Sequence, residues 1–113
     1  MGAMPEPREC ILLEYAEPSG RIPFREWLEE LREKRVRAAI DARLLRVRLG
    51  NFGDARPVGS GVEEMRVHVG PGYRVYFARD GDQIVLLLIA GEKRAQTKDI
   101  KAAKQFWANY KEE

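Results

Sequence analysis

Four side chains that could bind and cleave a phosphodiester lie on two neighbouring segments of this 113-residue chain: Arg66, His68, Arg74 and Tyr76. Apolar and polar residues alternate in both segments, which predicts two strands of a hairpin. A three-residue loop, 70–72, would set apolar residues opposite one another. The apolar pairs are then Val69 with Tyr73, Val67 with Val75 and Met65 with Phe77. In this register His68 is opposite Arg74, Arg66 is opposite Tyr76, and all four share one face.

Such a patch has the groups that RNA cleavage by the 2′-hydroxyl requires. The two arginines can bind phosphate oxygens bidentately and stabilise the charge of the transition state. The imidazole of His68 suits proton transfer, and Tyr76 can stack on a base or donate a proton. Lys93 and Arg94 directly follow an apolar run and are expected to reach the same phosphate. The alternative is a charged outer sheet face, in which His68 is only hydrogen-bonded to its neighbours.

A basic stretch offers a second candidate surface. Residues 21–48 carry nine basic and five acidic side chains, although the net charge of the chain is only +2. This pattern suits binding to a polyanion such as RNA or to an acidic protein. On composition alone, a solvated helix surface with internal ion pairs is the favoured interpretation. The candidate RNA-binding residues are Arg43, Arg46, Arg48 and Arg94.

The elements that must position these residues follow the order β-α-α-β-β-β-α. The apolar spacing predicts strands over about 9–16, 64–69, 73–77 and 84–90, and helices over about 23–31, 36–49 and from Thr97 onward. A further short strand near residues 56–58 is compatible with the pattern. Because few residues join the first two helices, we expect them to form an antiparallel hairpin. The prediction is an α+β fold: an antiparallel sheet, a helical hairpin packed on it, and a C-terminal helix.

Composition narrows the class of protein. A hydrophobic content of 44% and a charged content of 34% fit one folded domain, expected over residues 9–113, with residues 1–8 a tag or a disordered N-terminus. Cys10 is the only cysteine, which excludes an internal disulfide and a thiolate-rich metal site. We expect neither a metal nor a cofactor. No segment has the roughly 20 apolar residues of a membrane span or resembles a secretory signal, so we expect a cytoplasmic location and no membrane partner.

Several runs of residues carry a family resemblance. They are residues 23–28, 42–44, 50–54, 56–62, 64–66, 70–77, 86–88, 91–96 and 98–100, and the most specific is Gly-Pro-Gly-Tyr-Arg-Val-Tyr-Phe at 70–77. Together they resemble the RelE/ParE-like toxin superfamily, and within it the phage-derived, HigB-like addiction module killer proteins. The resemblance covers nearly the whole chain from Cys10 onward.

The resemblance implies a RelE-like fold and the toxin of a type II toxin–antitoxin system. A cognate antitoxin, usually with a helix-turn-helix DNA-binding domain, would neutralise the toxin, and the complex would bind operator DNA through the antitoxin. The expected activity is that of a metal-independent mRNA endoribonuclease, an mRNA interferase that acts on free or ribosome-bound mRNA. The alternative is a non-enzymatic, ParE-like inhibitor of DNA gyrase that acts through the helical hairpin.

The same resemblance suggests residue roles. In RelE-like ribonucleases a strand arginine contacts the scissile phosphate, and Arg74 matches it by its place in the Gly-Tyr-Arg run. Arg66 is the second candidate, and Lys93 lies in the family's lysine-containing turn after the last strand. The chain departs from the family in its proton-transfer groups. RelE-type enzymes carry further basic residues on the strand before the phosphate-binding arginine and a tyrosine or histidine near the C-terminus as acid or base. Here the strand before Arg74 offers only Arg66 and His68. Tyr110 is a candidate for the C-terminal group, although its helical spacing indicates packing.

Overall fold

The computed structural model describes residues 8–113, which form five strands and three α-helices. In chain order these are β1 (Ile11–Glu14), α1 (Pro23–Glu30), α2 (Lys34–Arg48), β2 (Ala55–Gly59), β3 (Val62–Val67), β4 (Tyr73–Asp80), β5 (Ile84–Glu92) and α3 (Gln96–Glu112), with a short 3₁₀ turn, η1 (Lys93–Ala95), before α3. Apart from Arg8, the expected N-terminal tag lies outside the described residues. None of the helices within residues 8–113 combines the length and the apolar character needed to cross a membrane.

The strands form one mixed sheet in the order β1-β5-β4-β3-β2. The α+β class and the C-terminal helix are confirmed, and the additional strand near residues 56–58 is β2. The prediction of a purely antiparallel sheet was wrong, because β1 pairs with β5 in parallel. β1 and β5 are far apart in the sequence, so no tight turn determines their relative direction. Side chains alternate between faces in the same way in parallel and antiparallel strands.

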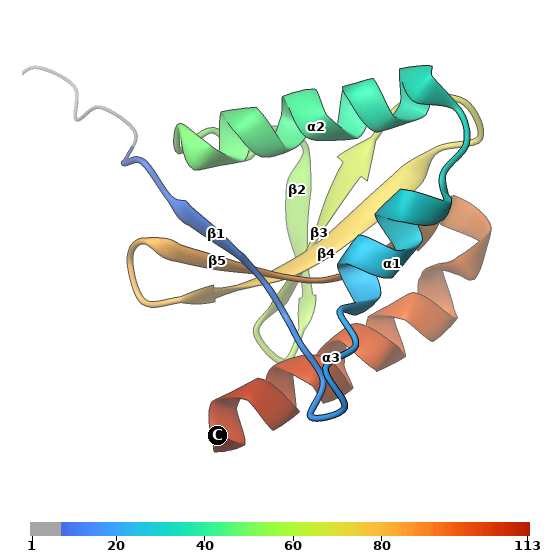
Figure 1. Cartoon of the computed structure of the whole chain (residues 1–113). Coiled ribbons are helices and arrows are strands. Elements are labelled where there is room, and N and C mark those ends of the chain that lie inside the picture. The colour runs from blue at the N-terminus through green and yellow to red at the C-terminus, as the bar shows by residue number, and fades with distance from the viewer. Residues whose placement is uncertain (1–7) are drawn as a thin grey trace, which may run out of the picture.

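Helices cover both faces of the sheet (Figure 1). α1 and α2 pack on one face over a core that includes Phe24, Ile40 and Phe77. α3 packs on the other face, where Trp107 and Ala103 meet Leu88 among others. The two central strands, β4 and β5, are therefore buried from both sides. The uninterrupted apolar run over residues 84–90 predicted this for β5, whereas the alternation over residues 73–77 did not predict it for β4.

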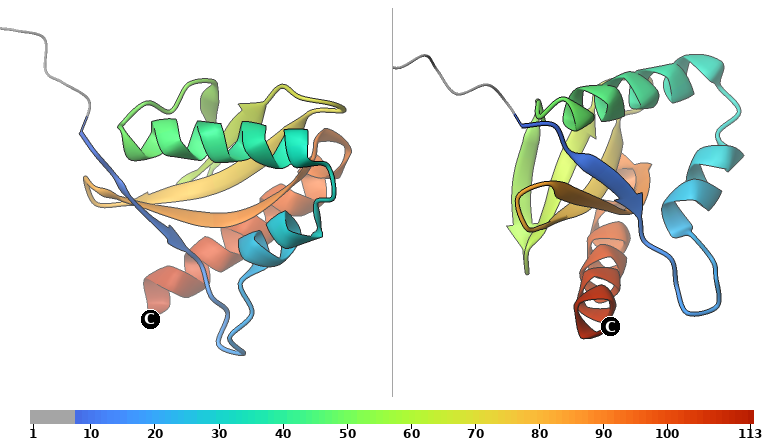
Figure 2. Two further views of the ribbon diagram at one scale, coloured as in Figure 1. Left: turned by 45° about the horizontal axis from the view of Figure 1, so that its top comes forward. Right: turned by 60° about the vertical axis from the view of Figure 1, so that its left-hand side comes forward.

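The expected antiparallel hairpin of α1 and α2 is not formed side by side. α1 packs on β5, whereas α2 packs on β3. Figure 2 shows α1 turning away from α2 at their connection in both views. The connection is short, as expected, but α1 has only eight residues, and its buried Phe24 and Leu28 belong to the same core cluster as buried residues of α2 and of the sheet.

The β3–β4 hairpin has a register two residues away from the expected one. Val67 pairs with Tyr73 and Met65 with Val75, so a five-residue connection, 68–72, replaces the expected three-residue loop. Gly70 and Gly72 both have positive φ, and the Gly72 amide donates to the Val69 carbonyl, which closes a tight turn inside this connection. The predicted apolar face is unchanged, because a shift of two residues preserves the alternation of side chains.

Candidate functional site

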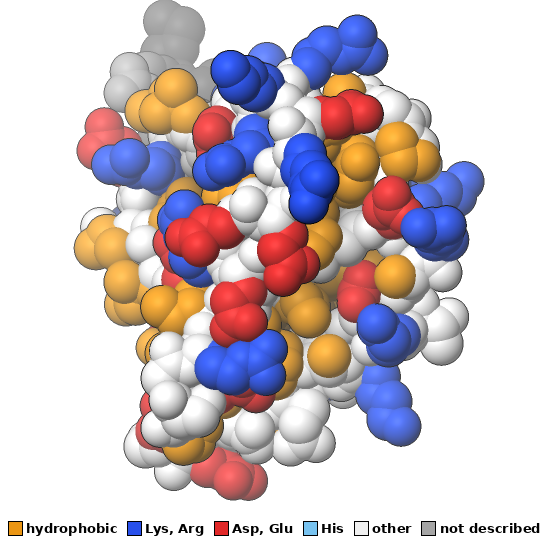
Figure 3. Space-filling model, turned by 45° about the vertical axis from the view of Figure 1, so that its right-hand side comes forward, with side chains coloured by type: hydrophobic (Ala, Val, Ile, Leu, Met, Phe, Trp, Pro, Cys, Tyr) orange, Lys and Arg blue, Asp and Glu red, His pale blue; other side chains and the backbone are white. Residues whose placement is uncertain are grey.

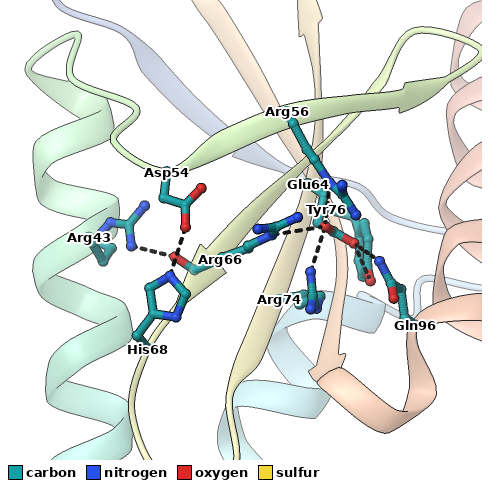
Figure 4. A network of polar contacts seen from close by, with 9 residues as sticks. All are labelled: Arg43, Asp54, Arg56, Glu64, Arg66, His68, Arg74, Tyr76 and Gln96. Carbon is teal, nitrogen blue, oxygen red and sulfur yellow. Dashed lines mark hydrogen bonds and ion pairs between the residues drawn. The ribbon is translucent and has the colours of Figure 1, made fainter.

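The centre of the candidate site is a single carboxylate on the α3 side of the sheet. Glu64, in β3, has no exposed surface. Its Oε1 accepts a hydrogen bond from Arg74 Nη1 at 2.7 Å. Its Oε2 accepts hydrogen bonds from Gln96 Nε2 at 2.8 Å and from the Tyr76 hydroxyl at 3.2 Å (Figure 4). Both oxygens of the buried carboxylate are therefore hydrogen-bonded by side chains from β4 and from the start of α3.

Two further arginines approach the same carboxylate. The Nε atoms of Arg56, in β2, and Arg66, in β3, lie 3.3 Å and 3.6 Å from Glu64 Oε1. The strand register explains this convergence: Arg56 pairs with Glu64, and Arg66 pairs with Arg74 on the neighbouring strand. We call Arg56, Arg66 and Arg74 the arginine cluster. Three guanidinium groups around one carboxylate leave two positive charges in excess.

The members of the arginine cluster differ in exposure. The side chain of Arg74 is only 10% exposed, that of Arg66 is 31% exposed and that of Arg56 is 52% exposed. The Nε of Arg66 and the Nε of Arg74 are both buried and make no hydrogen bond within residues 8–113. Arg74 is thus held by Glu64 inside the protein, whereas the side chains of Arg56 and Arg66 are partly exposed.

The environment keeps Glu64 ionised and Tyr76 protonated. Burial opposes the ionisation of Glu64, but hydrogen bonds from Gln96, Arg74 and Tyr76 and the charge of Arg74 outweigh it, so its pKa lies below the ordinary value. Burial, together with the charge of Glu64, raises the pKa of Tyr76 well above the ordinary value. Tyr76 also has no exposed surface, so its role here is to donate to Glu64 rather than to stack on a base.

His68 does not join the arginine cluster. The expected pairing with Arg74 was wrong, because β3 ends at Val67 and Arg66 takes that position. His68 is exposed, and its Nε2 lies 2.7 Å from Asp54 Oδ2 (Figure 4). This hydrogen bond lowers the pKa of Asp54. The expected pairing of Arg66 with Tyr76 was also wrong, since Tyr76 lies opposite Glu64.

Lys93 and Arg94 lie at the start of η1, directly after β5. Both side chains line a hollow of about 460 Å³, together with Pro71, Glu92 and Gln96. The Lys93 amide donates to the carbonyl of Gly72 at 3.0 Å, which ties η1 to the β3–β4 connection. Gln96 also contacts Glu64, so the hollow adjoins the arginine cluster. The expected proximity of Lys93 and Arg94 to this part of the sheet is therefore seen.

The α2 candidates have different surroundings. Arg43 points inward and donates to the carbonyls of Arg66 and Phe52, and burial lowers its pKa. Arg46 and Arg48 are exposed at the C-terminal end of the helix. Arg43 therefore joins α2 to β3 and to the chain that follows α2, whereas Arg46 and Arg48 are available to a partner. Charged side chains of both signs are dispersed among hydrophobic ones over the face in Figure 3.

Comparison with known proteins finds a relative of this chain. No family model matches the sequence. A Haemophilus influenzae protein described as uncharacterized is 45% identical over 83 residues, which cover 74% of this chain and 84% of that protein. The chain belongs to the family of this Haemophilus protein. Because the relative's description names no activity, the function of this family must be argued from the site.

Sequence reasoning missed the residues that organise the site. Glu64 alternates with the core residue Met65, which placed it on the polar face without marking it as buried. Gln96 carries no periodic or spacing signal at all. Asp99, in the first turns of α3, is 4% exposed, and its Oδ2 makes no hydrogen bond among the described residues. Burial raises the pKa of Asp99. In the structure Gly91 lies beside Asp99, and its lack of a side chain leaves room for the carboxylate, but nothing in the sequence links these two positions.

Proposed function

We propose that this protein is a RelE/ParE-like toxin of a type II toxin–antitoxin system, and that it inhibits translation as a metal-independent mRNA endoribonuclease. The observation that carries the RNA target is the arginine cluster, with its two positive charges in excess of Glu64. A compact group of guanidinium donors that extends from the buried Arg74 to the exposed Arg56 fits a phosphate of the RNA backbone. The family resemblance of the sequence supports the toxin assignment.

In this proposal the members of the cluster have separate tasks. Glu64 holds Arg74 in place, and Arg74 in turn occupies the buried side of the phosphate site. Arg66 and Arg56 approach from the exposed side and contact the non-bridging oxygens. The 2′-hydroxyl gives up its proton to solvent water as its oxygen bonds to phosphorus, and the bond from phosphorus to the 5′-oxygen breaks. The arginines stabilise the charge that builds on the phosphorane. This stabilisation does not require a change in the protonation of any arginine.

Proton transfer is assigned to a different residue from those first considered. His68 is bonded to Asp54 outside the cluster, and Tyr76 is buried against Glu64. Lys93 is exposed and lines the hollow beside Gln96. We therefore propose the Lys93 ammonium as the group that donates a proton to the leaving 5′-oxygen. The substrate is mRNA, free or on the ribosome, and a helix-turn-helix antitoxin neutralises the toxin and contacts the operator DNA.

A second candidate function has its own observation. Leu45, in α2, and Leu49, directly after its last residue, are more than half exposed, and the neighbouring Arg46 and Arg48 are also exposed. Exposed leucines flanked by cations are typical of a protein-binding surface. This surface favours the alternative of a non-enzymatic, ParE-like gyrase inhibitor, in which α2 makes the inhibitory contact and the arginine cluster only stabilises the sheet.

The two functions predict opposite results in cells. The experiment is pulse labelling of protein and DNA synthesis after induction, with mapping of new mRNA 5′ ends, for the wild type, Arg66→Ala and Arg79→Ala. Arg79 is the matched control, because it is a partly exposed β4 arginine that pairs with Glu63 away from the cluster. Early loss of translation with new 5′ ends, abolished only by Arg66→Ala, supports the ribonuclease. Blocked DNA synthesis with intact mRNA would reject it in favour of gyrase.

A further inference from the structure

The hollow beside the arginine cluster has the position of a nucleobase site. Gln96 lines the hollow and also donates to Glu64 at 2.8 Å. On the sheet, Arg74 pairs with Gly91, and Glu92, which lines the same hollow, is the next residue of β5 and pairs with Tyr73. If the cluster binds a phosphate, as the proposed function requires, the base of the adjacent nucleotide lies within reach of the hollow.

The side chains around the hollow combine one strong acceptor with two strong donors. Glu92 contributes a carboxylate whose side chain is 34% exposed. Lys93 and Arg94 contribute an ammonium and a guanidinium group, and Pro71 contributes an apolar ring that can pack on the face of a base. The NH₂ group of Gln96 is used by Glu64, so its carbonyl oxygen remains as a further acceptor.

This set of groups matches one RNA base. Guanine presents two adjacent donors, N1–H and N2–H, which a carboxylate can accept as a bidentate pair, and next to them O6 accepts from an ammonium or guanidinium group. Adenine and cytosine instead direct a ring-nitrogen lone pair towards the carboxylate, which repels it. Uracil has a single N–H between two carbonyl acceptors. We propose that the hollow binds a guanine base next to the cleaved phosphate, with Glu92 as the specificity-determining residue.

The ion pair between Glu92 and Arg94 does not prevent this binding. Their atoms are 2.6 Å apart, but the Arg94 side chain is 87% exposed. Exposed ion pairs are weak, because water competes for both partners and long side chains lose freedom. A guanine edge can therefore replace Arg94 on Glu92, and the released guanidinium group can donate to guanine O6, which leaves Lys93 free to act on the leaving oxygen.

The test is an NMR titration of the ¹⁵N-labelled protein with 3′-GMP, 3′-IMP, 3′-AMP, 3′-CMP and 3′-UMP, following the backbone amides of Lys93 and Gln96. We expect 3′-GMP to bind about tenfold more tightly than 3′-AMP. Inosine lacks the N2 amino group and should lie between them. Glu92→Gln should remove the preference and retain weak binding through the phosphate. Glu112→Gln, which removes the same charge from an exposed position near the end of α3, should keep the preference.

Two outcomes would overturn the guanine site: equal affinity for all the nucleotides, or a guanine preference that survives Glu92→Gln. The mRNA 5′ ends separate this failure from a failure of the proposed function. New ends without guanine next to the cuts would keep the ribonuclease and reject the guanine site. Guanine-selective binding without any new ends in cells would reject the ribonuclease and keep the guanine site.

Discussion

Replacing Glu64 by glutamine should lower the free energy of unfolding far more than expected for a residue that the sequence pattern places on the polar face of β3. The wild-type carboxylate balances Arg74, whose side chain is 10% exposed, and also accepts from Gln96 and Tyr76. In Glu64→Gln the shape is retained, but Arg74 stays buried without a counter-charge. Breaking a buried ion pair in this way costs roughly 3–5 kcal/mol. That is a large part of the roughly 5–15 kcal/mol by which typical domains are stable, and urea unfolding at pH 7 would measure it.

Glu63→Gln is the matched control for this experiment. Glu63 is the preceding residue on the opposite face, and its ion pair with Arg79 is partly exposed, which predicts a cost of about 1 kcal/mol or less. The pH dependence supplies a second check. Because the pKa of Glu64 is lowered on folding, its contribution is present above the ordinary glutamate pKa and lost as the pH falls through the folded value. The gap between wild type and Glu64→Gln should therefore narrow in acid. Equal costs for Glu64→Gln and Glu63→Gln, or a gap independent of pH, would refute the reasoning.

Three further predictions concern neighbouring groups. Burial raises the pKa of Asp99, so the folded state is favoured by its protonated form in acid and loses that stability as the pH rises and the carboxyl ionises. Asp99→Asn should therefore raise Tm at pH 7, and this gain should vanish in acid. Gly91→Ala should cost roughly 1–3 kcal/mol, because the new Cβ would clash with Asp99 Oδ2. A double-mutant cycle with Asp99→Ala should show most of that cost relieved. Arg43→Ala should cost roughly 1–3 kcal/mol in urea unfolding by leaving the carbonyls of Arg66 and Phe52 unpaired, whereas Arg46→Ala, at an exposed position, should change stability by less than about 0.5 kcal/mol.

The elements and their buried faces could be predicted because periodicity follows directly from burial. The buried face of α2 consists of residues that recur at helical spacing: Val36, Ile40 and Val47. Val75 and Phe77 alternate with residues of the other face, and both belong to the core that α1 and α2 cover. The direction of β1 could not be predicted in this way, since a short apolar strand has the same pattern whichever way it runs.

The register of the β3–β4 hairpin shows a second limit of hydrophobic patterning. The expected pairing of Val67 with Val75 and the observed pairing of Val67 with Tyr73 both match apolar with apolar. A shift of two residues changes every cross-strand partner and leaves every face intact. The choice depends on the conformation of residues 68–72, where the turn begins before the Gly-Pro-Gly segment. This error alone removed Glu64 from the expected site and brought His68 into it.

The arginine cluster contains more charge than the fold needs. Arg74, Gln96 and Tyr76 already provide hydrogen bonds to both oxygens of Glu64. Arg56 and Arg66 add ion pairs that are long and partly exposed, and such pairs contribute about 0–1 kcal/mol each. If the cluster served stability alone, these two arginines would be dispensable. If it binds phosphate, Arg66→Ala should leave the free energy of unfolding nearly unchanged and lower RNA affinity. The slope of log affinity against log salt concentration should become shallower by about one unit, the amount expected for one lost phosphate contact. An unchanged salt dependence of RNA affinity would mean that the cluster stabilises the sheet and does not bind RNA.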